Sequence, residues 1–249
     1  MISVDAIAVE FSGDTLFSDV SFVINEQDKI ALMGKNGAGK STMMKIIAGV
    51  QKANRGHIRY PKDAVIAYLP QHLLTNDSLT VFEETSKAFG HIFEMRYEIE
   101  RLNKELETRT DYDSDAYMNI ISQVSDLGEK YYSLEEVNYE AEVEKALAGL
   151  GFRRSDFTRL TSEFSGGWRM RIELAKILLQ KPDLILLDEP TNHVDIESVI
   201  WLEDFLLNKA KAVIVISHDK TFIDTITNRT IEVTMGKIYD YKANYSHYL

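Results

Sequence analysis

Three short stretches of the sequence carry residue types that suit phosphate chemistry. The first is GKNGAGKS, residues 34–41, which follows the apolar run KIALM and precedes helical composition from Lys40 to Ala48. It fits G-x-x-x-x-G-K-[ST], in which glycines let backbone N–H groups turn toward phosphates and the following helix points its positive end at them. We therefore expect Lys40 to reach the β- and γ-phosphates of a nucleotide and Ser41 to ligate Mg²⁺.

The second stretch is LILLDE, residues 184–189, an apolar run that ends in two adjacent carboxylates. Side chains alternate along a strand, but at its end the geometry relaxes and both acids can face one site. Asp188 is then the expected Mg²⁺ partner, through water, and Glu189 is placed to polarise the water that attacks the γ-phosphate. Alone, the pair would simply be the polar end of a strand. Together with the phosphate loop, it predicts a catalytic site.

The third stretch is SGGWR, residues 165–169, which is Gly-rich and opens a helix, so it is also suited to phosphate. One chain thus carries two phosphate-directed helix starts. Three other residues gain a role only from a family resemblance. By themselves Phe11 would be a core residue, Gln71 an ordinary loop residue, and His218 a polar residue at a strand end.

Composition favours a globular protein. The 249 residues are 45% hydrophobic and 27% charged, and no apolar run approaches the roughly 20 residues that span a bilayer. The N-terminus lacks the basic region and cleavage site of a secretory signal. There is no cysteine, which excludes disulfides and thiolate metal sites, and a cytoplasmic location fits.

The net charge of −11 is concentrated in one internal segment. Residues 83–145 hold 17 Asp and Glu but only 7 Lys and Arg. Such a segment repels a phosphate backbone unless basic residues are arranged locally against it.

The same segment has the apolar spacing of two helices, with a polar connection, RTDYDSD, between them. This predicts an antiparallel helical hairpin, for which two surface helices lying on the core are the alternative. The apolar stripes comprise Ile92, Met95, Ile99, Leu102 and Leu106, then Tyr117, Ile120, Val124, Leu127, Tyr131 and Leu134.

The flanking regions predict a sheet protein. ISVDAIAVEF and LFSDVSFVI are typical of strands, as are HIRY and VIAYLP. KIALM, DLILLDEP and AVIVISHD are apolar throughout, as expected of central strands covered on both faces, where functional residues gather at the carboxyl ends. IEVTMGKIYDY predicts a hairpin that turns at Met235-Gly236.

Taken together, these motifs resemble the ATP-binding-cassette (ABC) ATPases over almost the whole chain. In order, the matching elements are the phosphate loop 34–41, Gln71 as the Q-loop, SGGWR as the signature, LILLDE as the second nucleotide motif, NHVD as the D-loop, and His218 as the switch histidine. The resemblance implies an α/β P-loop NTPase of the ABC type. Its mixed central sheet is joined by an antiparallel β-subdomain and by a helical subdomain with an α-hairpin arm.

The resemblance also implies roles for residues. In the family, two cassettes pair head to tail, and each ATP lies between the phosphate loop of one and the signature helix of the other. Ser165, Gly166 and Gly167 would therefore face the nucleotide of a partner cassette. Catalysis would involve Glu189, His218, Lys40 and Gln71, and Mg²⁺ would be held by Ser41, Gln71 and Asp188. ATP binding would involve Phe11, stacked on the adenine, with Gly34, Asn36, Gly37, Ala38, Gly39, Lys40, Ser41 and Thr42.

The branch that the chain resembles is the ABC-F class. Trp168 stands where most transporter cassettes have Gln, and Asn192 and His193 occupy EPTNHVD where transporters vary. ABC-F proteins have two cassettes in one chain, and many act on the ribosome in translation or antibiotic protection. By this resemblance residues 1–249 form a single cassette. Residues 83–135 correspond to the helical arm of the family, and a helical signature subdomain would cover about 136–182.

A second cassette and its linker are missing from this sequence, so we expect it to be the N-terminal cassette of a longer protein and a poor ATPase alone. Its expected partners are a second cassette, or a second copy of the chain, and the ribosome, with a basic ribosomal protein an easier contact for the acidic arm than rRNA. Two alternatives remain: the cytoplasmic ATPase subunit of a transporter, and a non-catalytic module that dimerises with nucleotide.

Overall fold

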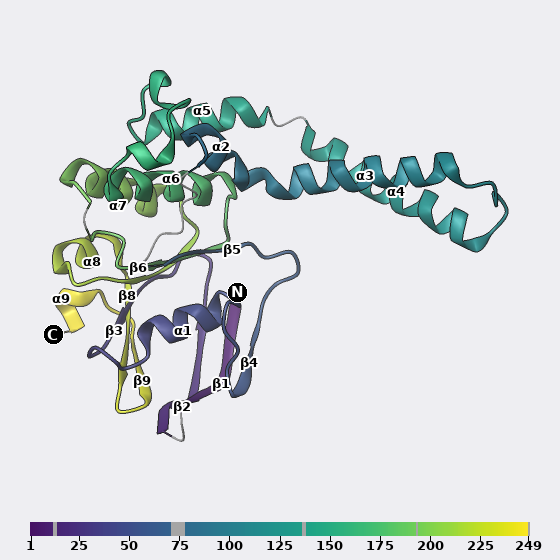
Figure 1. Cartoon of the computed structure of the whole chain (residues 1–249). Coiled ribbons are helices and arrows are strands. Elements are labelled where there is room, and N and C mark those ends of the chain that lie inside the picture. Colours follow the sequence, from purple (N-terminus) through teal and green to yellow (C-terminus); the bar gives the residue numbers. More distant parts are fainter. Residues whose placement is uncertain (12–13, 71–77, 136–137, 193, 249) are drawn as a thin grey trace.

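The structure is a computed structural model that describes residues 1–11, 14–70, 78–135, 138–192 and 194–248. It contains two β-sheets with helices packed around them (Figure 1). The smaller sheet is antiparallel and has the strand order β2-β1-β4. These strands are β1 (Ile2–Phe11), β2 (Asp14–Ile24) and β4 (Arg55–Arg59).

The larger sheet has six strands in the order β5-β6-β7-β3-β8-β9. All pairings are parallel except that of β9 with β8, and the turn between those two lies at Met235 and Gly236, as predicted. The mixed central sheet and the antiparallel subdomain are thus confirmed. The strands are β3 (Lys29–Met33), β5 (Ile66–Leu69), β6 (Leu184–Asp188), β7 (Ala212–Ile216), β8 (Arg229–Thr234) and β9 (Lys237–Tyr241).

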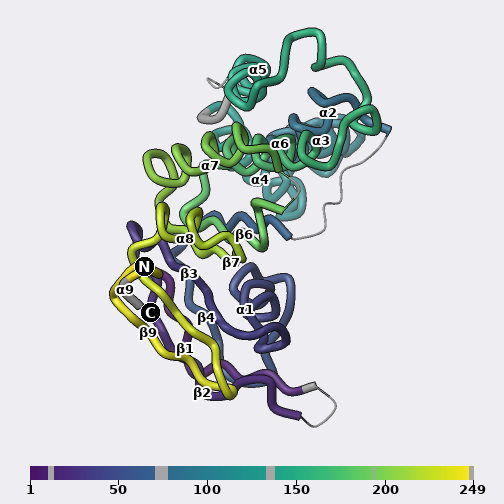
Figure 2. Tube along the Cα trace, turned by 90° about the vertical axis from the view of Figure 1, so that its left-hand side faces the viewer, coloured from purple at the N-terminus to yellow at the C-terminus, as the bar shows by residue number. Residues whose placement is uncertain are grey.

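Both faces of the larger sheet are covered, which explains why its central strands are apolar throughout. Along β6, Leu184 and Leu186 join a core that contains α1 (Lys40–Ile47) and the antiparallel sheet. The intervening Ile185 and Leu187 join a second core, shared with the helices on the opposite face. Figure 2 shows this layering, with α1 on one side of the sheet and α6 and α7 on the other.

The second core is built mainly from helices α2 and α5 to α8. Their bounds are α2 (Val81–Ser86), α5 (Tyr139–Gly149), α6 (Gly166–Leu179), α7 (Ile196–Asn208) and α8 (Lys220–Ile226), and α9 (Tyr245–Tyr248) follows near the end. Short 3₁₀ turns occupy Lys87–Phe89, Arg154–Asp156 and Thr161–Glu163. Inside this lobe Lys176 of α6 donates to buried Glu84 of α2 across 2.8 Å, which ties the two helices together.

A helical hairpin projects from the lobe (Figure 1). It consists of α3 (Gly90–Thr108) and α4 (Asp115–Glu135), joined by the polar connection that the sequence predicts. Only Leu102 and Ile120 of its apolar stripes are buried among the residues described, because two helices share a single seam. Residues 83–89, which we assigned to the arm, instead pack into the lobe, where α2 contacts α5 and α6. The projecting part therefore begins at Gly90.

Candidate nucleotide-binding site

The phosphate loop leaves β3 and enters α1 through glycines that the fold of this chain requires. Gly34 has φ 143° and Gly39 has φ 100°, a backbone region that other residues adopt only with strain. A β-carbon on Gly34 would lie 2.4 Å from the carbonyl oxygen of Val233, and one on Gly39 would lie 2.9 Å from the Phe17 ring. Gly39 directly precedes α1, so the loop ends with the N-terminal amides of that helix open toward the cavity.

Lys40 folds back over this loop. Its ammonium donates to the carbonyl of Gly34 across 2.8 Å and to that of Lys35 across 3.2 Å. Burial lowers the pKa of Lys40, and the nearby carboxylates Glu189 and Asp188 partly offset the effect. A cation held against the phosphate loop suits the binding of a phosphate group.

The acidic end of β6 turns sharply. Asp188 is the last strand residue, and Glu189 follows with φ 54°, in the left-handed region. Strict strand alternation would place the two carboxylates on opposite faces, so this turn is what brings both to one cavity. The Glu189 amide donates to the carbonyl of Ile216 on β7 across 2.9 Å, which anchors the turn.

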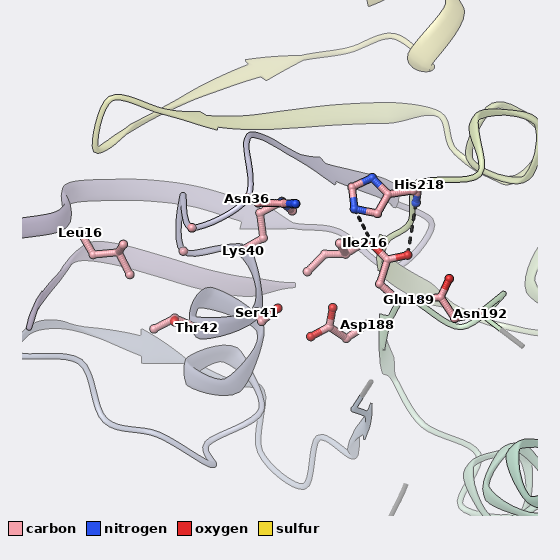
Figure 3. A pocket seen from close by; sticks show the side chains of 12 residues that line it. Leu16, Asn36, Lys40, Ser41, Thr42, Asp188, Glu189, Asn192, Ile216 and His218 are labelled. Atoms are coloured by element: carbon pink, nitrogen blue, oxygen red, sulfur yellow. Dashed lines mark hydrogen bonds and ion pairs between the residues drawn. The ribbon is translucent and has the colours of Figure 1, made fainter. Parts of the chain in front are cut away.

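His218, which follows the end of β7, contacts the Glu189 side chain through two groups. Its backbone amide donates to Oε2 across 3.2 Å, and its Nε2 lies 3.5 Å from Oε1 (Figure 3). The imidazole is mostly exposed, whereas the Glu189 side chain is 8% exposed. Glu189 is therefore fixed at the cavity wall while the His218 ring stays accessible to a ligand.

These elements surround a cavity of about 530 Å³. In Figure 3 Lys40 and Ser41 face Asp188 and Glu189 across it. Among the predicted residues, the lining includes Asn36, Gly37, Gly39, Lys40, Ser41, Thr42, Asp188, Glu189 and His218. Gly34 and Ala38 do not line it: Gly34 offers its carbonyl to Lys40, and Ala38 packs on the core below.

Two predicted site residues cannot be placed. Gln71 lies outside the described residues, and so does the side chain of Phe11. Three lining residues were missed by the sequence reasoning: Leu16 of β2, Ile216 at the end of β7, and Asn192 of the NHVD segment. Of these three, only Asn192 could have been predicted from the sequence, because it lies in the D-loop motif.

Tyr68 of β5 lies near the acidic end of β6. Its hydroxyl is buried and has no hydrogen-bond partner among the described residues. Burial, followed by the negative charge of Asp188, raises the pKa of Tyr68 to about 12. The phenol therefore stays protonated and can act as a donor toward that end of the sheet.

The oxygen groups at this site fit Mg²⁺ held together with a nucleotide. Mg²⁺ keeps several waters and is typically bound by one or two protein oxygens plus substrate phosphates. Ser41 and Asp188 supply a hydroxyl and a carboxylate to the same cavity. The described residues contain no group of three His, Cys, Asp or Glu that could hold a metal on their own.

Comparison with known proteins identifies the family. A family model described as ABC transporter matches residues 17–192, most of the chain and both sides of the cavity. The chain belongs to the ABC transporter family. The matched residues include the phosphate loop and the acidic end of β6.

Curated relatives of this cassette belong to the ABC-F class. ABC transporter F family member 5 of Arabidopsis thaliana is 35% identical over all 249 residues, which span 36% of that protein. The energy-dependent translational throttle protein EttA of Escherichia coli K12 is 37% identical over 221 residues, which are 89% of this chain and 39% of that protein. The predicted ABC-F resemblance is confirmed, and the cassette spans well under half of these relatives.

Solved structures share the fold. The ATP-binding subunit of an ABC transporter matches with a TM-score of 0.72 at 19% identity, covering 98% of this cassette and 89% of that chain. The dimeric post-hydrolysis structure of the ATP-binding cassette MJ0796 with ADP and Pi matches with a TM-score of 0.67 at 19% identity, covering 97% and 98%. In the described part of this cassette, no helix is both long and apolar enough to cross a membrane.

The signature stretch lies apart from this pocket. Ser165 is the N-cap of α6, and neither Ser165, Gly166 nor Gly167 lines the cavity. The Ser165 side chain makes no capping hydrogen bond within the described residues, so the start of α6 keeps open backbone amides of its own. The two helix starts that the sequence singled out therefore belong to different places in one cassette.

Proposed function

We propose that this cassette hydrolyses ATP as half of a head-to-tail pair and couples its nucleotide state to ribosome binding. The observation that carries the proposal is the cavity in which Lys40 and Ser41 face Asp188, Glu189 and His218. A phosphate cradle on one wall and a fixed carboxylate on the other are the parts that phosphoryl transfer to water requires.

Each side chain then has a role in hydrolysis. Lys40 and the amides at the start of α1 would hold the phosphates, and Ser41 and Asp188, together with Gln71, would hold Mg²⁺. When bound, Mg²⁺ neutralises phosphate charge. Glu189 orients the attacking water and accepts its proton, and its anchored backbone fixes that position. His218, whose Nε2 lies 3.5 Å from Glu189 Oε1, would contact the γ-phosphate.

The surroundings of Gly166 support a nucleotide site that is shared between two cassettes. A β-carbon on Gly166 would meet nothing within 4 Å in the described part of the chain, and its backbone is helical. Alanine at a position with this backbone conformation would stabilise the chain by roughly 0.4–1 kcal/mol. The fold of this chain therefore has no need of glycine there, whereas the close approach of an external phosphate does.

Complementation between two inactive variants tests the pairing. Lys40→Ala removes the cation that would contact the phosphates. Gly166→Asp places a carboxylate where the phosphate bound to the partner cassette would lie. Aspartate favours a first helical turn, so the second variant should fold. Each variant alone should release little phosphate. A mixture should regain activity, because mixed pairs contain one intact cleft. Wild-type hydrolysis by Gly166→Asp alone would overturn the composite site.

The ribosomal part of the proposal rests on the arm and the relatives. The relative EttA is named as a translational throttle protein. The α3–α4 hairpin projects from the cassette, where a large partner could contact it. Within the arm Arg101 pairs with Glu98 across 2.6 Å and Arg109 with Asp111 across 2.6 Å. Arg96 pairs with Glu100 across 3.7 Å. Because its arginines are already paired, the arm offers negative charge, which suits a basic ribosomal protein in the cytoplasm.

Charge reversal on the arm tests this contact. Glu107 and Asp113 are exposed near the tip, and we expect Glu107→Lys with Asp113→Lys to reduce co-sedimentation with ribosomes in ATP. ATP binding by dialysis should not change. A matched control is Glu26→Lys with Asp204→Lys, which alters two exposed acids on the cassette body. Equal loss in both variants would point to net charge alone and contradict a specific role for the arm.

A further inference from the structure

A second cavity, of about 580 Å³, lies at the base of the arm, where α3 leaves the helical lobe (Figure 1). It shares no lining residue with the pocket at the phosphate loop. Four elements wall it: the start of α3, the last two turns of α5, the end of α6 and one face of α7. Small-molecule sites typically have volumes of about 300–1,000 Å³ and mostly apolar walls with a few polar groups, so this cavity has the size and walls of such a site.

The floor of this cavity is apolar and aromatic. On α7, Trp201 and Phe205 lie one turn apart with their rings stacked, 3° from parallel and with centres 5.7 Å apart. Phe89, Leu178 and Leu179 also line the cavity. Phe89 is buried, whereas the other four side chains are only partly covered by the chain itself. Apolar surface that stays in contact with water inside a concave site favours a ligand with an apolar body.

The rim of the cavity is basic. Lys145 of α5, Lys181 after α6 and Lys209 after α7 line it, and all three are exposed. None of the three has an ion-pair partner within the described part of the chain, although the whole sequence carries a net charge of −11. Glu142 is the one acid among the described lining residues. Lysines near helix ends also suit the helix dipole, but together with an apolar floor they form a site for an amphipathic anion.

Two positions in the wall carry residues that the fold alone does not require. Lys181 adopts φ 48°, in the left-handed region that glycine or asparagine usually occupies just past a helix end. Its amide donates to the carbonyl of Leu178 across 3.1 Å, a bond that glycine would make equally well. A β-carbon on Gly149, at the end of α5, would meet nothing within 4 Å among the described residues. The missing side chain at Gly149 therefore widens the cavity without relieving any contact.

We propose that this cavity binds a small amphipathic carboxylate, of the chemical class of a medium-chain fatty acid. The hydrocarbon chain lies on the stacked rings of Trp201 and Phe205, where its apolar surface leaves water. The carboxylate stays at the rim among Lys145, Lys181 and Lys209. Walls on four sides suit a small molecule better than the helix of a protein partner, which needs an open groove. The site is separate from the proposed ATP site, because the two share no lining residue.

Equilibrium dialysis of the wild-type chain against radiolabelled dodecanoate, below the concentration at which it forms micelles, tests the site. We expect saturable binding at one site per chain. Dodecyltrimethylammonium has the same hydrocarbon chain and the opposite charge, and should bind about tenfold more weakly or worse, because three lysines act together on one charge. The chain has two tryptophans, so Trp168→Phe leaves Trp201 as the sole indole. Its emission should change with dodecanoate along the same saturation curve.

Substitutions at the rim and in the wall locate the binding. Lys145→Glu, Lys181→Glu and Lys209→Glu together should weaken dodecanoate binding by about tenfold or more. Gly149→Leu should weaken dodecanoate and dodecyltrimethylammonium alike, because its side chain enters the cavity, and leucine favours a helix more than glycine does. The matched control changes the net charge as the rim variant does, should stay within about twofold of the wild type, and consists of three exposed lysines, Lys52→Glu, Lys62→Glu and Lys237→Glu.

Three results would overturn the site. The first is no saturable dodecanoate binding by a chain with a cooperative unfolding transition, which would leave the apolar floor to a protein partner. The second is equal affinity for dodecanoate and dodecyltrimethylammonium, which would remove the carboxylate from recognition. The third is equal weakening by the rim variant and its control, which would reduce the effect to net charge. No measurement here reads ATP or ribosomes, so failure of this site is distinct from failure of the proposed function.

Discussion

Helices α1 and α6 both begin beside glycines and differ in their surroundings. Gly39 precedes α1, whereas Gly166 and Gly167 are the first residues of α6, and neither N-cap residue makes a side-chain hydrogen bond. The start of α1 meets two carboxylates and a histidine of its own chain across one cavity. The start of α6 lines no part of that cavity. Under the proposed function both helix starts bind phosphate, and the surrounding fold completes only the first of them within this chain.

The two helices are also held in place differently. The buried face of α1 is wholly apolar, with Met43, Met44, Ile46 and Ile47 packed between the sheets. Helix α6 also buries apolar residues, but it carries two cations besides, buried Arg171 and partly buried Lys176, each paired with an acid on another element. The phosphate loop is therefore followed by a helix held through apolar packing, whereas the signature helix is held in part by ion pairs that pH and substitution can alter.

The largest expected effect concerns the carboxylate that completes the α1 site. Glu189→Gln keeps the size of the side chain but cannot accept a proton, so hydrolysis by the paired cassette should fall by about 10²–10⁴-fold. ATP affinity should stay within about twofold. Phosphate release at saturating ATP and equilibrium dialysis measure the two quantities. Unchanged turnover would remove Glu189 from the chemistry, and Glu197→Gln, an exposed acid on α7, is the control.

The next effect concerns the cation at the start of α1. Lys40→Ala removes a charge-assisted hydrogen bond of about 1.5–3 kcal/mol, so ATP affinity should drop roughly 10–100-fold. Lys45→Ala, an exposed lysine in the last turn of the same helix, should bind ATP normally. Dialysis against labelled ATP compares them. Equal affinities for both variants would mean that the backbone cradle alone holds the phosphates.

How much of the structure the sequence alone predicts depends on how far apart the interacting residues lie along the chain. The phosphate loop, the apolar strands and the acidic strand end are local patterns, and each was predictable. Glu84 lies in the segment 83–135 that we assigned to the arm, yet it is 1% exposed. Its partner Lys176 lies 92 residues away, and no local pattern reveals such a pair. This is also why the predicted arm begins too early.

The pocket shows the same limit. Leu16 lines it only because β2 passes beside Gly39, where a β-carbon would come within 2.8 Å of it. That contact depends on how the antiparallel sheet packs on α1. The left-handed turn at Glu189 is likewise set by its bond to Ile216 on a neighbouring strand. Local motifs therefore indicate phosphate chemistry, whereas the residues that wall the cavity are set by tertiary packing.

A third prediction addresses the ionic attachment of α6. Burial opposes ionisation of Glu84, but hydrogen bonds from Lys176 and Lys87 prevail and lower its pKa below the ordinary 4.5. The unfolded chain therefore binds this proton more readily, and the stabilisation is full above pH 4.5 and lost as pH falls through the folded pKa. Glu84→Gln should cost about 1–3 kcal/mol at neutral pH.

Urea unfolding at several pH values measures this contribution. The gap between Glu84→Gln and wild type should narrow as pH falls below 4.5. Glu94→Gln, an exposed acid on α3, should track the wild type throughout. A gap that stays constant down to strongly acidic pH would show that the carboxylate is not what attaches α6 to α2.

The smallest effect separates the two helix starts most directly. Gly166→Ala should stabilise the chain by roughly 0.5–1 kcal/mol, because a helical position without neighbours gains from the methyl group. Gly39→Ala should instead destabilise it by about 1–2 kcal/mol or more, since φ 100° is strained for alanine and Leu16 and Phe17 occupy the space. Thermal unfolding compares both with the wild type. If Gly166→Ala proves stabilising and leaves the chain's own ATP affinity unchanged, yet lowers phosphate release in the paired form, glycine at that position serves a ligand outside its own chain. Loss of stability in both variants would mean that the start of α6 is constrained from within, as that of α1 is.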